Sequence, residues 1–221
     1  MSPATPIITI GKPLIELSEI DSTNIYAMAQ IEQGLAVSGS VYQAFHQTQG
    51  KGQHGRPWES TAGKNLLCTY ILSLTDLKSG KKWEAGDQKA FSATIALGVR
   101  EFFDQECGGG TRIKLPNDIY WNDRKAGGIL IENKWRGPEW TWAIIGIGVN
   151  INQTDFSPLA GNPISLQQIT GKTYSIQSMQ IKLAAALNKY LNEWMENGET
   201  PILEKLNQYL ISINGNQINA T

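Results

Sequence analysis

Between residues 111 and 151 the sequence joins short strand-forming runs by very short connections. The connections are the Pro116-Asn117-Asp118 turn, the Asn122-Asp123 reversal and a hairpin tip at Gly137-Pro138. Connections this short join neighbouring strands in antiparallel order, because a parallel pair needs a crossover of a dozen or more residues. This part of the chain therefore predicts a largely antiparallel sheet.

The other predicted strands and helices precede or follow that segment in the sequence. The β-branched and aromatic content at Ser40–Phe45 and Asn65–Leu74 predicts two more strands, and residues 1–20 read as an extended lead-in with a short strand at residues 7–10. Apolar spacing typical of helices predicts four of them, at residues 25–33, 87–107, 175–195 and 201–210. The order predicts an α/β (α+β) fold, with a mixed, largely antiparallel sheet, helices on one face and no regular βαβ alternation.

Composition limits the classes of function. Of the 221 residues, 41% are hydrophobic and 18% charged, which is typical of a soluble globular protein. The net charge of −1 shows no basic excess, so a nucleic-acid partner is not expected and any anion site must be local. The two cysteines lack metal-ligand spacing, and no stretch has the length of a membrane span or the pattern of a signal peptide. The sequence therefore predicts a cytoplasmic protein without a membrane partner.

The polar segment at residues 47–58 has glycines at positions 50, 52 and 55, interleaved with basic side chains that include Lys51 and Arg56. Glycine lets the backbone approach a ligand, and successive N–H groups then cradle an anion. The segment is neither a Walker A loop nor a dinucleotide fingerprint. By itself it is more typical of a flexible surface connection.

Two further segments have the composition of a binding site. Lys114 and Asp118 flank the Pro-Asn-Asp turn, and Lys125 precedes Ala126-Gly127-Gly128, which places a cation beside bare backbone. At residues 146–152, glycines within a strand mark a close approach of another group, and Asn150 is suited to a base edge or a phosphate. Each pattern alone also fits a solvated hairpin or a strand that runs into an Asn-rich turn.

Taken together and in this order, the segments resemble those of a biotin protein ligase over roughly residues 15–200. The resemblance rests on Asp21-Ser22-Thr23-Asn24, residues 47–58, Lys114-Leu115-Pro116-Asn117-Asp118-Ile119-Tyr120, residues 124–132 and residues 146–150. It implies a catalytic domain similar to that of class II aminoacyl-tRNA synthetases. It also implies a reaction in which biotin and ATP, with Mg²⁺, form biotinyl-5′-AMP. The biotin then passes to a lysine of a biotin carboxyl carrier protein.

The resemblance also implies roles for individual residues. The biotin site would comprise Ser22, Thr23, Asn24, Gln47, Gly50, Lys51, Gly52, Gln53 and Gly128. The ATP and adenylate site would comprise Arg56, Trp58, Lys114, Asn117, Lys125 and Asn150. Lys125 would touch both the biotin carboxylate and the α-phosphate, and Asp118 would orient or deprotonate the acceptor lysine. Metal ligands are not identifiable from the sequence.

The chain departs from the family pattern in two places. The usual loop reads Gly-Arg-Gly-Arg-x-Gly-Arg, whereas Lys51 and Gln53 replace the first two arginines here. The lost charge predicts weaker retention of the adenylate, unless neighbouring N–H groups compensate. The family's SH3-like barrel would not fit after the catalytic domain, so we predict a domain at 1–200 and a truncated or vestigial segment at 201–221.

Two alternatives remain open at this stage. A lipoate- or octanoyl-transferring protein would share the fold and the lysine, but it tends to lack the glycine-rich loop. A non-catalytic biotin sensor would not need the charges of Lys114, Asp118 and Lys125. No helix-turn-helix precedes the first helix, so a DNA-binding repressor module is not expected, and the resemblance fits a monomer or a homodimer equally.

Overall fold

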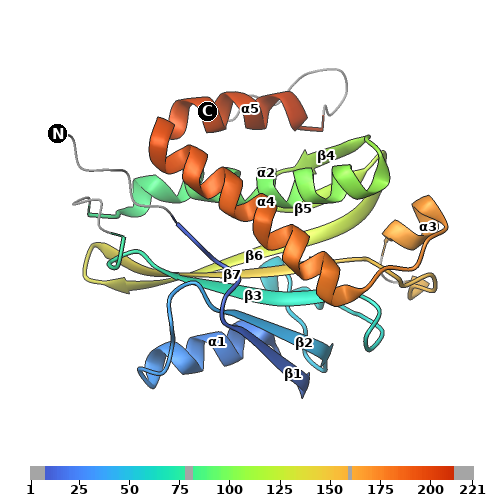
Figure 1. The fold of residues 1–221 in the computed structure, drawn as a ribbon, viewed down its shortest axis with the longest axis horizontal. Coiled ribbons are helices and arrows are strands. Elements are labelled where there is room, and N and C mark those ends of the chain that lie inside the picture. The colour runs from blue at the N-terminus through green and yellow to red at the C-terminus, as the bar shows by residue number, and fades with distance from the viewer. Residues whose placement is uncertain (1–7, 78–81, 159–160, 212–221) are drawn as a thin grey trace.

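The computed structural model describes residues 8–77, 82–158 and 161–211. Its centre is a seven-stranded sheet with the order β1-β2-β3-β7-β6-β5-β4 (Figure 1). The strands are β1 Leu14–Ile20, β2 Val41–Gln47, β3 Leu66–Ser73, β4 Thr111–Lys114, β5 Asp118–Trp121, β6 Arg124–Arg136 and β7 Glu139–Val149. The β1–β2 pair is parallel and the other five pairs are antiparallel, which confirms the predicted mixed, largely antiparallel sheet.

The long helices divide between the two faces of this sheet. Helices α2 (Gln88–Cys107), α4 (Ile176–Asn197) and α5 (Glu199–Tyr209) cover one face, as predicted, whereas α1 (Thr23–Glu32) lies on the other (Figure 1). A short α3 (Leu166–Thr170), which was not predicted, connects β7 to α4. Helix α1 takes the opposite face because a separate small core holds it there, formed with Ala27 by Tyr42, Ile71 and Ile144.

Strand alternation explains how one sheet supports two different layers. Along β3 and β7, residues such as Tyr70, Ile145 and Ile147 point into the main core beneath α2 and α4. Burial of each such side chain contributes about 1.5–3 kcal/mol. The intervening residues, Thr69 and Gly146 among them, face the α1 side, because successive side chains in a strand alternate between faces.

The N-terminal segment differs from the prediction. Ile8 and Ile10 form no strand; they are buried, and their N–H groups donate to the side-chain oxygens of Asn192 and Asn188 on α4. Ile7 lies outside the described residues. The first strand is instead Leu14–Ile20, within the stretch that was predicted as a lead-in. It pairs in parallel with β2, and no short turn between the two strands indicates this pairing in the sequence.

The C-terminal helix belongs to the same core as the rest of the chain. Ile202 and Leu206 of α5 are buried in it, and Arg100 of α2 stacks over the Tyr209 ring at 3.8 Å. Leu210 then bridges to Ile113 of β4. The boundary predicted at residue 200 stays a prediction, and residues 212–221 lie outside the described chain. Among the described helices, none has both the length and the apolarity needed to cross a membrane.

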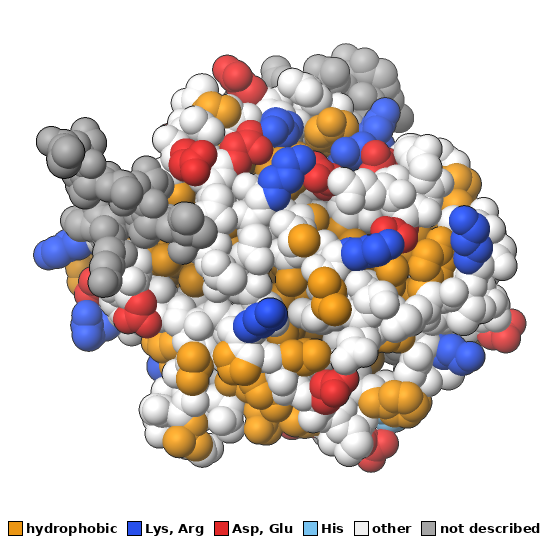
Figure 2. Space-filling view, in the orientation of Figure 1, with side chains coloured by type: hydrophobic (Ala, Val, Ile, Leu, Met, Phe, Trp, Pro, Cys, Tyr) orange, Lys and Arg blue, Asp and Glu red, His pale blue; other side chains and the backbone are white. Residues whose placement is uncertain are grey.

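Charged side chains of both signs are interspersed over α4 and α5 (Figure 2). Several of them form ion pairs between helices, such as Lys182 with Glu106 at 2.7 Å and Lys189 with Glu101 at 2.8 Å. Burial alone would raise the pKa of Glu101, but hydrogen bonds from Lys189 and Tyr190 outweigh it and hold that pKa below its ordinary value. This side of the molecule is therefore a packed layer with an ion-paired surface.

Candidate active site

A cavity of about 740 Å³ opens on the side of the sheet that carries α1. Its walls come from the start of α1, the loop at residues 47–58, the β4–β5 turn and the facing residues of β3, β6 and β7. The predicted site residues that line it are Ser22, Thr23, Asn24, Gln47, Lys51, Gly52, Gln53, Arg56, Trp58, Lys114, Asn117, Asp118, Lys125, Gly128 and Asn150. Gly146 and Gly148, predicted to mark a close approach of another group, also line it, whereas the sequence analysis missed other lining residues, including Glu59, Leu67, Tyr120, Leu130 and Phe156.

The floor of the cavity is a row of four residues on adjacent strands. Leu67 pairs with Gly148, Gly148 with Gly128, and Gly128 with Asp118. The indole of Trp58 lies on the two glycines: a Cβ at position 148 would be 2.5 Å from its Cε2, and one at 128 would be 3.2 Å from its Cζ3. The glycines are therefore required by the ring, whose buried Nε1 has no hydrogen-bond partner among the described residues.

The glycine-rich loop folds as a small hairpin. The N–H of Gly52 donates to the carbonyl of Arg56 at 2.7 Å, and the N–H of Trp58 donates to that of Gly50 at 2.8 Å. Gly50 is the one predicted site residue absent from the cavity lining; a Cβ there would meet the carbonyl oxygen of Trp58, so its role in the structure is close packing. Of the three glycines only Gly55 has a positive φ, of 71°.

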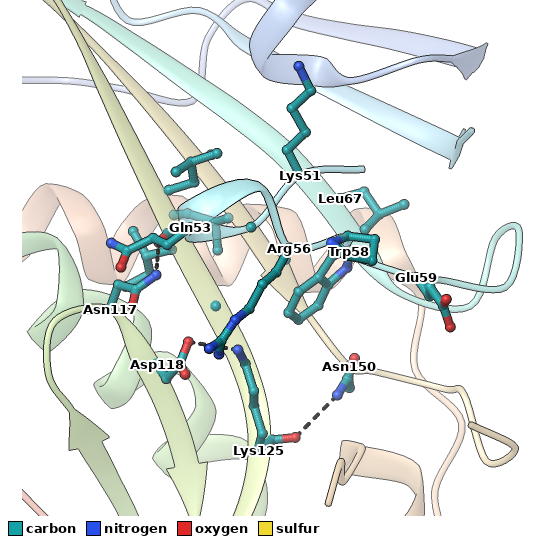
Figure 3. Close-up of a pocket in the computed structure, with 18 of the residues that line it drawn as sticks. Lys51, Gln53, Arg56, Trp58, Glu59, Leu67, Asn117, Asp118, Lys125 and Asn150 are labelled. Atoms are coloured by element: carbon teal, nitrogen blue, oxygen red, sulfur yellow. Dashed lines mark hydrogen bonds and ion pairs between the residues drawn. The ribbon is translucent and has the colours of Figure 1, made fainter. Parts of the chain in front are cut away.

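The loop's basic side chains point in different directions (Figure 3). Arg56 extends toward Lys125 and Asp118, whereas Lys51 points away from them. Both are exposed, so either is free to meet an anion that enters from solvent. Gln53 lies on the side of the cavity that holds Asn117.

Lys125 is held from several sides. Its Nζ lies 2.7 Å from Oδ1 of Asp118 and 5.8 Å from the centroid of the Trp58 ring. Its own N–H donates to Asn162 at 2.8 Å, and its carbonyl accepts from the N–H of Ile164 at 2.9 Å and from the side chain of Asn150 at 3.3 Å. With its backbone fixed and its side chain about one-third exposed, Lys125 presents a positioned ammonium to the cavity.

The turn before β5 is fixed to β6 by Asn117. Its side-chain amide donates to the carbonyl of Ile129 at 2.6 Å, and its carbonyl accepts from the N–H of the same residue at 2.9 Å. The neighbouring Asp118 is thereby placed opposite Gly128. Lys114 is exposed at the mouth of the cavity, with its Nζ 5.4 Å from the centroid of the Tyr120 ring.

At the other end of the cavity is a cluster of polar side chains, in which Thr23, Asn24 and Thr69 are buried, Gln47 is half-buried and Glu132 is exposed. Oε1 of Gln47 accepts from the backbone N–H of Thr23 at 2.7 Å, and the Thr23 hydroxyl lies 3.0 Å from the same oxygen. The amide of Asn24 donates to the Glu132 carboxylate at 2.8 Å and lies against Gly146, where a Cβ would collide with it. Thr69 completes the cluster from β3. The sequence analysis missed Thr69 and assigned no role to Glu132; the signal that could have found Thr69 was a polar residue within a strongly apolar strand.

The arrangement separates three kinds of chemistry within one cavity. A buried polar end suits a compact head group with hydrogen-bonding groups, and the Trp58 slot suits an apolar stem. The cationic end, with Lys125, Lys114 and Arg56, suits anions. Cys68, whose residue borders the cavity, is no candidate nucleophile, because burial raises the pKa of its thiol to about 12.

Known proteins with similar sequences share one activity in their names. Residues 17–150 match the model of the biotin/lipoate A/B protein ligase family. The bifunctional ligase/repressor BirA of Escherichia coli is 29% identical over 207 residues, which cover 90% of this chain and 61% of that protein. The biotin–[acetyl-CoA-carboxylase] ligase of Paracoccus denitrificans is 33% identical over 192 residues, covering 84% and 76%. The chain thus spans less than two thirds of the length of the E. coli relative.

Solved structures show the same fold. The biotin protein ligase from Aquifex aeolicus in complex with biotin and ATP superposes with a TM-score of 0.75 at 24% identity, covering 90% of this chain and 79% of that one. The Leishmania major biotin protein ligase in complex with biotinyl-5-AMP gives 0.72 at 21% identity, covering 93% and 85%. At these identities the likeness establishes the fold.

Proposed function

Because the chain belongs to the biotin/lipoate A/B protein ligase family, we propose that it is an ATP-dependent biotin ligase. It would form biotinyl-5′-AMP from biotin and ATP and transfer the biotin to a lysine of a biotin carboxyl carrier protein. The observation that carries the proposal is the division of one cavity into a buried polar end at Thr23 and Asn24 and a cationic end at Lys125. Biotin has the matching division, with a cyclic urea at one end and a carboxylate at the other.

In the first step the biotin carboxylate attacks the α-phosphorus of ATP, an O–P bond forms, and pyrophosphate leaves. Two anions must approach one another for this attack. The ammonium of Lys125 reduces their repulsion and stabilises the charge that builds on the phosphoryl oxygens. Arg56 and Lys114, at the mouth of the cavity, are placed to bind the remaining phosphates.

The residues present fit a Mg²⁺ ion that arrives with the nucleotide. Among the described residues no group of three or more acidic, cysteine or histidine side chains forms a resident metal site. The acidic residues of the cavity lining are Glu59 and Asp118, and Mg²⁺ commonly combines one or two carboxylates with substrate phosphates. Bound there, Mg²⁺ would shield the charge of the leaving pyrophosphate.

In the second step the amine of the carrier's lysine attacks the acyl carbon, and AMP leaves. The attacking amine must first lose a proton, and Asp118 is the carboxylate nearest to Lys125 in the cavity. We assign Asp118 the task of orienting that amine and accepting its proton. The indole of Trp58 covers the glycine floor and would exclude water from the fragile anhydride.

The test is pyrophosphate release on mixing the protein with ATP and biotin, followed by mass spectrometry of a carrier domain. We expect release that depends on biotin, and a carrier that gains one biotin on a single lysine. Lipoic acid replaces biotin as the matched control. Release that depends on lipoic acid, or binding of biotin with no release, would overturn the proposal.

A further inference from the structure

One hydroxyl group beneath the start of α1 contacts both residues that begin the helix. Thr69 of β3 is fully buried, and its Oγ1 lies 2.6 Å from Oδ1 of Asn24 and 2.7 Å from Oγ1 of Thr23. Thr69 is absent from the residues that line the cavity, whereas its two partners line it. Any effect of Thr69 on a ligand therefore passes through Thr23 and Asn24.

The orientation of the Asn24 amide decides what Thr69 does. Its nitrogen faces two acceptors, the carbonyl of Leu130 at 3.3 Å and the carboxylate of Glu132 at 2.8 Å. Its oxygen must then face Thr69, whose hydroxyl donates to it. Without that hydroxyl the buried oxygen would lack its donor, and an unsatisfied buried acceptor is strongly unfavourable.

The second contact of Thr69 leads to Gln47. Because the proton of Thr69 goes to Asn24, the contact at 2.7 Å takes the proton of the Thr23 hydroxyl, while the backbone N–H of Thr23 donates to Oε1 of Gln47 at 2.7 Å and turns this oxygen toward α1. The Nε2 of Gln47 is left on the other side, near Gly50, where a Cβ would be 3.1 Å away from it. The side chain of Gln47 thus has a single orientation as long as Thr23 keeps its place.

We propose that Thr69 is a positioning residue for the polar end of the cavity, where it fixes the hydrogen-bond directions of Thr23, Asn24 and, through Thr23, Gln47. Thr69 touches no ligand atom itself. The inference rests on the proposed function, because it takes the head group of biotin as what this end of the cavity binds. It predicts an effect on biotin binding and none on ATP binding.

The experiment compares Thr69→Val with Thr69→Ser in calorimetric titrations with biotin. Valine keeps the shape and removes the hydroxyl, so we expect a Kd about tenfold higher, whereas serine should restore wild-type binding. In the pyrophosphate assay KM for biotin should rise by the same factor, with KM for ATP and kcat unchanged. Thr94→Val is the matched control, because Thr94 is equally buried but donates to Ala90 within α2.

The outcomes separate the two proposals. If the wild-type protein fails to bind biotin, the proposed function is wrong and this inference is lost with it. If the wild type binds but Thr69→Val binds equally well, or weakens ATP and biotin alike, only the positioning role is overturned. Should Thr69→Val fail to fold, Thr69→Cys takes its place, since a thiol is a weaker donor. Binding by Thr69→Cys equal to that of Thr69→Ser would then contradict the proposal.

Discussion

The two faces of the central sheet come from the same strands and have opposite character. On the face covered by α2 and α4, β7 presents Ala143, Ile145, Ile147 and Val149, all buried in the main core. On the face that carries α1, the alternate positions of the same strand hold Ile144, Gly146 and Gly148, and Asn150 follows directly after the strand ends. The side chains are large where helices must be held and absent where a ligand must approach the backbone.

The two faces divide binding and stability between them. The closed face obtains its free energy from apolar burial, so a change of side-chain volume there lowers the free energy of unfolding. The open face exposes polar groups and bare backbone, so its residues contribute little burial but supply the cavity's chemistry. Substitutions on the open face should therefore lower activity, and substitutions on the closed face should lower stability.

The largest effect is expected for Lys125→Met on the open face. Loss of the ammonium should lower the rate of pyrophosphate release about a thousandfold, or about 4 kcal/mol in the activation free energy, because it removes the cation that lies between the carboxylate and the α-phosphate. The thermal midpoint should change little, since Lys125 is partly exposed. Lys134→Met is the control: Lys134 pairs with Glu32 at 3.0 Å, and its loss should leave the rate intact. An active Lys125→Met enzyme would contradict the mechanism.

On the closed face, Ile145→Ala should lower the free energy of unfolding by about 3 kcal/mol, through lost burial and the cavity that remains. Ile145 is fully buried, whereas Ile181 on α4 is 62% exposed, so Ile181→Ala should cost almost nothing. Urea unfolding measures both. The rate per folded molecule should match the wild type, and a loss of kcat at full folding would show that the two faces are coupled.

The sequence could predict those elements whose structure depends on residues close to one another in the chain. The hairpins from β4 to β7 follow from short connections, and α2 follows from its apolar spacing and the Gly108 stop. The parallel β1–β2 pair could not be predicted in the same way, because it depends on α1 crossing the sheet to return the chain. The face of the sheet on which α1 lies was likewise decided by a small core that joins it to residues distant in sequence. The spacing of the apolar residues within α1 does not specify that face.

The same limit applies to the candidate site. All the residues to which the resemblance assigns a role in the site line one cavity, except Gly50. Thr69 carries no motif signal, since its meaning depends on the register that pairs it with Gly146 beneath Asn24. Glu132 stood at the end of a motif, yet its contact with Asn24 joins residues 108 positions apart. Residue patterns therefore do not predict the register between strands or the path by which the chain crosses the sheet.

A smaller effect is expected for Gly148→Ala, which adds one methyl group to the open face. The new Cβ would lie 2.5 Å from the Trp58 ring, so the indole must move off the floor. We expect kcat/KM to fall roughly thirtyfold, equivalent to about 2 kcal/mol, as is typical of overpacking in a fitted site. Gly86→Ala is the control, because, apart from its chain neighbours, no atom of the described residues lies within 4 Å of a Cβ there. Equal activity of both variants would mean that the position of Trp58 does not matter.

The smallest effect concerns the edge of the open face, where Gln53 replaces a family arginine. Gln53→Arg should slow dissociation of biotinyl-5′-AMP about fivefold, because a charged donor contributes about 1 kcal/mol more than a neutral one. Stopped-flow release of preformed adenylate measures this rate, and Gln208→Arg adds the same charge on the exposed side of α5 as a control. An unchanged rate would mean that N–H groups of the loop hairpin already compensate for the missing charge. The open face would then retain its intermediate through backbone groups alone, as its bare glycines also suggest.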